Sequence, residues 1–174
     1  MKLGVEERYL RALPNDDPVV IDNVEVTLLD ANHCPGSVMF LFKFPSGMAA
    51  LHVGDFRAVP AMEEYPTLWN VSVDTVYLDT TYCKEQHDFP SQSDVIERTK
   101  ELVRQNLDAT NVKTLIAVGS YTIGKERIFL ALAEMLDCKV WANAEKTRVL
   151  KAIRDPRIEG RLVKSPNSAQ VPWI

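Results

Sequence analysis

The chain has 174 residues, a formal net charge of −4 and a hydrophobic fraction of 46%. This length accommodates one hydrophobic core but not two full domains, and no apolar run is long enough to span a membrane. The N-terminus lacks the apolar region of a signal peptide, and the three cysteines contain no Cys-x-x-Cys pair. These features argue against a disulfide scaffold, a thiolate zinc finger and a membrane protein, and they indicate an intracellular protein.

The charge is unevenly distributed along the chain. Residues 98–164 carry 14 Lys and Arg against 8 Asp and Glu, whereas the remainder carries 6 against 16. An acidic part is suited to cations and a basic part to phosphates. For most of the basic residues taken individually, the solvated face of a helix is the better explanation.

The first half of the chain predicts a sheet. Residues 1–22 do not begin a self-contained domain, and the next segment alternates as a half-buried strand with Val24, Val26 and Leu28 on one face. The second strand is apolar on both faces and should be deeply buried. A crossover through irregular residues should return the fourth strand in the direction of the third. The expected strands cover residues 23–30, 38–44, 51–53 and 75–78.

The second half predicts helices that alternate with strands. Ser91 and Asp94 give a helix start that resembles a capping box. The helix that begins at Glu126 is apolar nearly all round and should be enclosed, whereas Lys146 should be exposed on the last helix. Periodicity is lost from Arg154 onward. The alternation indicates an α/β fold; the expected helices cover residues 92–107, 126–136 and 144–153, and the expected strands cover 113–118 and 138–141.

Three polar side chains stand where predicted strands end. His33 follows the first strand, Asp55 the third and Asp79 the fourth. Because these three strands run in the same direction, all three side chains should lie at one edge of the sheet. Imidazole and carboxylates that converge at strand ends are typical of metal sites. The plainer alternatives are a hydrogen-bonded loop histidine and ordinary Gly-Asp turn residues.

A glycine-rich segment, Gly119–Lys125, has the pattern G-x-x-x-x-G-K between a predicted strand and a helix. The P-loop requires Ser or Thr after the lysine, but Glu126 stands there and offers a carboxylate instead of a hydroxyl for magnesium. Nucleotide hydrolysis is therefore disfavoured. A DNA or RNA phosphate at the helix N-terminus, with Lys125 beside it, and a plain strand-to-helix turn both remain open.

Five segments in order closely resemble the DNA cross-link-repair nucleases of the β-CASP branch of the metallo-β-lactamase superfamily, the Artemis and Apollo group. The segments are Leu-Leu-Asp-Ala-Asn-His-Cys-Pro-Gly-Ser, Leu-His-Val-Gly-Asp-Phe-Arg, Tyr-Leu-Asp-Thr-Thr-Tyr-Cys, Phe-Pro-Ser-Gln-Ser and Val-Gly-Ser-Tyr-Thr-Ile-Gly-Lys-Glu-Arg. The likeness covers roughly residues 1–153. Five ordered segments are far more specific than any one of them alone.

The resemblance implies a partial αββα metallo-β-lactamase core over residues 1–82 and the start of a β-CASP cap over residues 83–174. It implies that His33 is a zinc ligand, that Asp55 bridges two zinc ions and is catalytic, and that Asp79 is a catalytic acidic residue. The implied reaction is phosphodiester hydrolysis from a 5′ end of DNA, in interstrand cross-link and double-strand-break repair. The implied location is the nucleus, with DNA and repair-complex proteins as partners.

The chain also departs from the family pattern. It lacks the His-x-His-x-Asp-His motif, because its only histidines are His33, His52 and His87. We therefore interpret it as a fragment, poorly stable and inactive as a nuclease by itself, with an exposed apolar sheet edge. The alternatives are a non-catalytic remnant that binds DNA or a protein partner, and a metallo-β-lactamase nuclease directed at RNA.

Overall fold

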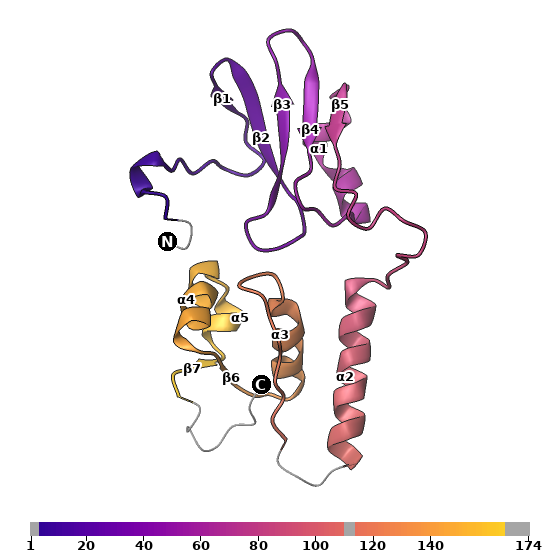
Figure 1. The fold of residues 1–174 in the computed structure, drawn as a ribbon, viewed down its shortest axis with the longest axis vertical. Helices are drawn as coiled ribbons and strands as arrows, with labels where there is room; N and C mark the ends of the chain where they lie inside the picture. Colours follow the sequence, from indigo (N-terminus) through magenta and orange to yellow (C-terminus); the bar gives the residue numbers. More distant parts are fainter. Residues whose placement is uncertain (1–3, 110–113, 166–174) are drawn as a thin grey trace. The chain divides into compact units, whose positions relative to one another are not determined.

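The computed structural model describes residues 4–109 and 114–165, and the chain divides between Cys83 and Lys84 into two compact units (Figure 1). Both units combine helices with strands, so the α/β class is confirmed. No helix within the described residues has the length and apolarity that crossing a membrane requires.

The first unit is built on a five-stranded sheet with the order β1-β2-β3-β4-β5 (Figure 1). Neighbours from β1 to β4 are antiparallel, and β5 is parallel to β4, as the crossover predicted. Strand β1 was not expected, because it is only three residues long and is followed by a tight turn. The strands are β1 (Val19–Ile21), β2 (Val24–Asp30), β3 (Val38–Lys43), β4 (Ala49–His52) and β5 (Thr75–Tyr77).

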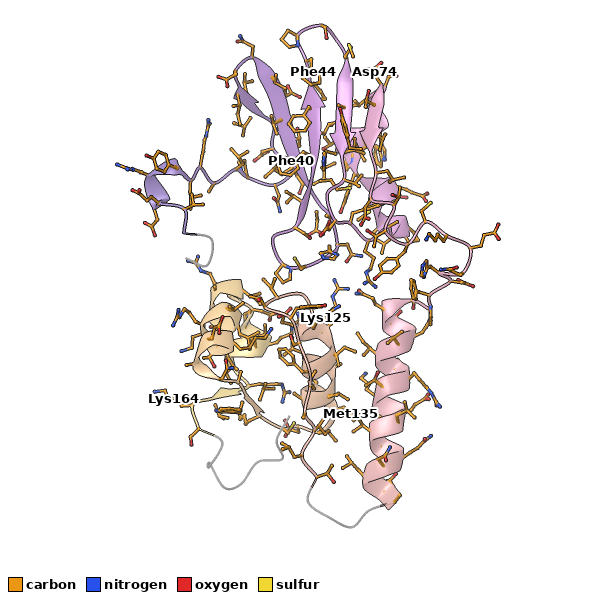
Figure 2. The ribbon with its side chains drawn as sticks, viewed as in Figure 1. Phe40, Phe44, Asp74, Lys125, Met135 and Lys164 are labelled. Atoms are coloured by element: carbon orange, nitrogen blue, oxygen red, sulfur yellow. The ribbon has the colours of Figure 1, made fainter. Side chains whose placement is uncertain are left out.

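The burial patterns of β2 and β3 are the reverse of those that the sequence predicted. Strand β2 is buried at four consecutive residues, 26–29, so the expected half-buried alternation is wrong for most of its length. Strand β3 alternates instead, because Met39 and Leu41 are buried while Phe40 and Phe42 stack on each other, half-exposed, with ring centroids 6.0 Å apart. Figure 2 labels Phe40 on this strand.

One face of the sheet is covered by the segment between β4 and β5, which the sequence predicted as irregular. It contains a 3₁₀ helix, η2 (Pro60–Glu64), and a short helix, α1 (Pro66–Trp69). Proline begins each of them, where its missing N–H is tolerated. Apolar side chains of this segment pack against buried residues of β2 and β3; the cluster consists of Leu29, Ala31, Met39 and Val53 with Leu51, Phe56, Met62, Tyr65 and Leu68 around them.

The second unit contains α2 (Gln92–Ala109), α3 (Glu126–Met135), α4 (Ala144–Ile153), α5 (Pro156–Glu159) and the parallel pair β6 (Val140–Trp141) and β7 (Leu162–Val163). Ser91 begins α2 as expected, because its hydroxyl accepts the Asp94 amide at 3.1 Å. Helix α3 is enclosed on most sides, also as expected. The buried core is Phe129, Leu130, Leu132, Ala133, Cys138, Val140, Leu150 and Ile158.

Three expectations for the second unit are wrong. The described part of the expected strand 113–118 is irregular, although Ile116 and Val118 still pack against the core; residue 113 lies outside the described residues. Residues 155–163 are not irregular, because Asp155 caps α5 and β7 pairs with β6, while residues 166–174 lie outside the described residues. Lys146 is not exposed, since its side chain is 19% accessible and contacts Glu126. Apolar content identified which residues pack in the core, but their backbone conformation depends on which strands or helices are available to hydrogen-bond with them.

Candidate active site

The carboxyl ends of β2, β4 and β5 lie at the same edge of the sheet. Strands β2 and β4 are both antiparallel to β3, and β5 is parallel to β4, so all three strands run in one direction. His33 follows β2, Asp55 follows β4 and Asp79 follows β5. The fold thus brings the three predicted residues to one edge through strand direction alone.

The loop that carries His33 is organised by Ser37. The Ser37 hydroxyl accepts the amide of His33 at 3.3 Å and that of Cys34 at 3.0 Å, and it donates to the Cys34 carbonyl at 2.8 Å. The loop begins at Asn32, which has a positive φ of 51° and donates its amide to Asp30 at 2.6 Å. These bonds fix the backbone, so the exposed imidazole of His33 projects from a defined turn.

The loop that carries Asp55 is tied to the same region. Gly54 adopts a φ of 56°, and a Cβ there would lie 3.4 Å from the Val38 carbonyl, so the position favours glycine. The Arg57 amide donates to the Ala31 carbonyl at 2.9 Å, which joins this loop to the one after β2. Asp55 itself is exposed.

His52 supports the Asp55 loop instead of acting as a strand-end ligand. Its Nδ1 accepts the Gly54 amide at 3.1 Å, and its ring stacks on Tyr77 with centroids 5.5 Å apart. The ring is thereby held on the sheet surface between β4 and β5. This geometry commits one of its two ring nitrogens to the backbone.

Asp79 is held as a carboxylate by Thr81. Its Oδ1 accepts the Thr81 hydroxyl at 2.6 Å and the Thr81 amide at 2.9 Å. These two bonds, the hydroxyl first, lower the pKa of Asp79 below its ordinary value, and the Phe56 amide and the charge of His33 act in the same direction. The electrostatic influence of His33 agrees with their position at one edge.

The residues at this edge have the chemistry of zinc ligands but do not by themselves form a complete site. An imidazole and carboxylates are suitable donors, whereas a catalytic zinc needs three protein ligands. Within the described residues, no group of three or more His, Cys, Asp or Glu is placed to hold a metal ion. A zinc ion at His33 and Asp55 would need a further ligand from outside these residues.

Sequence reasoning missed the residues that orient these side chains. Ser37, His52 and Thr81 each hold the backbone or carboxylate of a predicted site residue. For Thr81 the signal was available, since a carboxylate two residues before a threonine favours an Asx turn. For Ser37 and His52 no comparable pattern exists in the sequence, because their partners depend on the loop conformation.

In the second unit, the carboxylate of Glu126 binds the preceding loop, Gly119–Lys125. The Glu126 carboxylate is buried and accepts the Gly124 amide through Oε2 at 2.7 Å, while Oε1 accepts Lys146 at 3.1 Å. Exposed Lys125 stands at the N-terminal end of α3 (Figure 2). The carboxylate at position 126 therefore points back toward the loop, where it binds the Gly124 amide and the Lys146 ammonium.

Several other basic residues of this unit are neutralised locally. Arg98 contacts Glu101 and Lys100 contacts Glu97, both on α2, and Arg157 contacts Asp155. These pairs support the interpretation of such residues as ordinary solvated helix faces. The excess positive charge of residues 98–164 is thus only partly available to an outside partner.

No protein-family model matches the chain. It is 45% identical over 157 residues to the DNA cross-link repair 1A protein of Gallus gallus, which covers 90% of the chain and 16% of that protein. It is 41% identical to the DNA cross-link repair protein SNM1 of Arabidopsis thaliana, over 87% of the chain and 31% of that protein. The 5′ exonuclease Apollo of Gallus gallus is 38% identical, over 85% of the chain and 31% of that protein. The chain therefore spans less than a third of each of these relatives.

Proposed function

We infer that this chain, which belongs to the family of DNA cross-link repair proteins and the 5′ exonuclease Apollo, supplies part of the active site of a DNA repair nuclease. The proposed reaction is hydrolysis of a DNA phosphodiester from a 5′ end. The observation that carries the proposal is the meeting of His33, Asp55 and Asp79 at one sheet edge, inside segments that resemble this family. We further propose a partial metallo-β-lactamase core, the start of a β-CASP cap, a nuclear location and repair-complex partners.

In this proposal His33 and Asp55 bind zinc together with ligands that the described residues do not provide. Zinc, when bound, lowers the pKa of a bound water toward neutrality and offsets charge on the scissile phosphate. The chain's own contribution is orientation: Ser37 fixes the His33 loop, and the Arg57 amide ties the Asp55 loop to it. Thr81 keeps Asp79 ionised and directed by two hydrogen bonds.

The experiment is a chimera in which residues 1–153 of this chain replace the matching segment of the Gallus gallus DNA cross-link repair 1A protein. The substrate is a 5′-phosphorylated DNA oligonucleotide labelled at its 3′ end, and product lengths are followed over time with zinc present. We expect the chimera to digest DNA, and His33→Ala, Asp55→Asn and Asp79→Asn each to lower the rate at least 100-fold.

Asp22→Asn is the matched control, because Asp22 is an exposed turn residue with a φ of 49° that asparagine also tolerates. Circular dichroism and urea unfolding of each variant separate loss of chemistry from loss of folding. A folded, active chimera whose rate is unchanged by Asp55→Asn would contradict the proposed role of this edge.

A second candidate is a non-catalytic segment that binds DNA through its basic second unit. The incomplete ligand set at the sheet edge favours it for the isolated chain. For the 174 residues alone we expect no zinc-dependent digestion of DNA. Robust digestion that Asp55→Ala abolishes would show that the isolated chain is a nuclease.

A further inference from the structure

Lys146 is the centre of a partly buried cluster of hydrogen bonds in the loop before α3. Its ammonium lies 3.0 Å from the Ser120 hydroxyl and from the carbonyls of Tyr121 and Thr122, and 3.1 Å from the Glu126 carboxylate. The side chains of Lys146 and Glu126 are only 19% and 7% exposed. An ammonium has three protons, so these acceptors satisfy it fully and draw the backbone of residues 120–122 inward.

Glu126 completes the cluster from the other side of the loop. Its second oxygen accepts the Gly124 amide at 2.7 Å, and Gly124 adopts a φ of 101°, which strongly favours glycine. The carboxylate lies in the first turn of α3, where the helix dipole favours negative charge. The Gly124 amide and the Lys146 ammonium are therefore already engaged within the protein.

The outer surface of the same loop has a different character. Tyr121 is 79% exposed, and the Lys125 ammonium lies 5.9 Å from the centroid of its ring. An exposed aromatic ring beside a cation, on a loop fixed by internal bonds, suits a nucleic-acid strand: a base stacks on the ring while the ammonium meets a phosphate. The fixed backbone reduces the entropy lost on binding.

We propose that Tyr121 and Lys125 contact single-stranded DNA, and that Glu126 and Lys146 are positioning residues that hold the loop in the binding conformation. This inference rests on the proposed function, since it takes DNA as the ligand. It adds a base-stacking residue and a supporting ion pair, both of which belong to the second unit, whereas His33 and Asp55 belong to the first.

The test measures binding of the 174-residue chain to a fluorescein-labelled oligothymidylate by fluorescence anisotropy at several salt concentrations. We expect Tyr121→Ala to weaken binding about 5- to 150-fold, the range found for loss of one stacked base, and Tyr121→Phe to retain it within about twofold. Lys125→Gln should reduce the magnitude of the slope of log affinity against log salt by about 0.7, because one phosphate contact is lost. Tyr9→Ala and Lys151→Gln are exposed controls and should change neither quantity.

The positioning role is tested by coupling. Glu126→Gln and Lys146→Met should each weaken binding by no more than the double variant Tyr121→Ala/Lys125→Gln does, and neither should weaken it further when added to that double variant. A purely structural role would give additive losses. If Lys146→Met does not fold, Glu126→Gln carries this test, because it keeps an acceptor for the Gly124 amide while removing the charge.

Equal affinities of the wild-type chain and Tyr121→Ala would overturn the inference, and so would a wild-type chain that does not bind the oligonucleotide. The proposed nuclease function is judged separately, by the dependence of the chimera on His33, Asp55 and Asp79. An active chimera with no effect of Tyr121→Ala on binding would therefore reject the inference alone.

Discussion

Replacing Ser37 with alanine should loosen the loop that presents His33. The Ser37 hydroxyl makes three hydrogen bonds, to the amides of His33 and Cys34 and to the Cys34 carbonyl, at 3.3, 3.0 and 2.8 Å. Each such bond contributes about 0.5–1.5 kcal/mol net, and the longest, in an exposed loop where water can substitute, contributes least. We therefore expect the free energy of unfolding of the first unit to fall by about 1–2 kcal/mol.

Urea unfolding of the 174-residue chain measures this loss directly. Ser46→Ala is the matched control, because the Ser46 hydroxyl accepts only the Met48 amide, at 3.4 Å, in the turn between β3 and β4. The supporting shell of a metal ligand typically changes metal affinity or activity 10- to 100-fold, so Ser37→Ala should also slow the active chimera by at least 10-fold. A Ser37→Ala variant as stable and active as Ser46→Ala would refute the reasoning that Ser37 organises this loop.

The remaining predictions concern the core and the ionisable groups. Leu29→Ala should destabilise the first unit by about 2–5 kcal/mol in urea unfolding, because Leu29 is fully buried, whereas Val20→Ala at a 65% exposed position should cost far less. Burial raises the pKa of the Cys138 thiol, so the folded state disfavours its thiolate. Stability should therefore be retained below the thiol pKa of the unfolded chain, near 8.5, and fall as pH rises above it, and Cys138→Ala should remove that part of the decline. A thiol reagent at neutral pH should modify exposed Cys83 well before Cys138. The lowered pKa of Asp79 contributes stability above the ordinary carboxyl range, and this contribution disappears as pH falls through the folded-state pKa. Thr81→Val should move the Asp79 pKa upward in a carboxyl NMR titration, and an unmoved pKa would show that Thr81 is not the main cause.

The arrangement of the candidate site followed from the sequence because strand direction depends on a few readable signals. The turn at Pro45–Gly47 reversed the chain between β3 and β4, and a crossover of ordinary length returned β5 parallel to β4. Together with the antiparallel pairing of β2 and β3, these two facts place His33, Asp55 and Asp79 at one edge. The metal role of these residues is a separate prediction that strand direction does not test.

The details of burial did not follow, because they depend on segments that look irregular in sequence. Leu29 of β2 is covered by residues of η2 and α1, whereas Leu28 is paired with Asn15 from the segment before β1. Neither covering segment has the periodicity that identifies a longer element. Residues 114–118 have the composition of a strand, yet they pack against the core without strand geometry. Apolar content reports that a segment is buried, whereas its backbone conformation depends on which neighbour supplies hydrogen-bond partners.

Position 126 shows how one residue alters the meaning of a glycine-rich motif. In the sequence, a carboxylate after G-x-x-x-x-G-K is expected to repel phosphates, which argues against a nucleotide site. The sequence does not show where the side chain of that carboxylate lies. In the structure the Glu126 side chain is buried, and it accepts both the Gly124 amide and the Lys146 ammonium. One backbone amide of the loop and the Lys146 ammonium are thus engaged from within the protein, whereas Lys125 stays exposed. Removing the charge with Glu126→Gln while keeping Lys146 would leave an ammonium that lacks its counter-charge, so inorganic phosphate should bind beside Lys146 in this variant more tightly than it binds the wild-type chain. This gain is compatible with weaker oligonucleotide binding at Tyr121, which depends on the loop conformation and not on Lys146 directly. Calorimetric titration with phosphate measures that difference, and equally absent binding in both proteins would mean that the loop is too closed to admit an external anion.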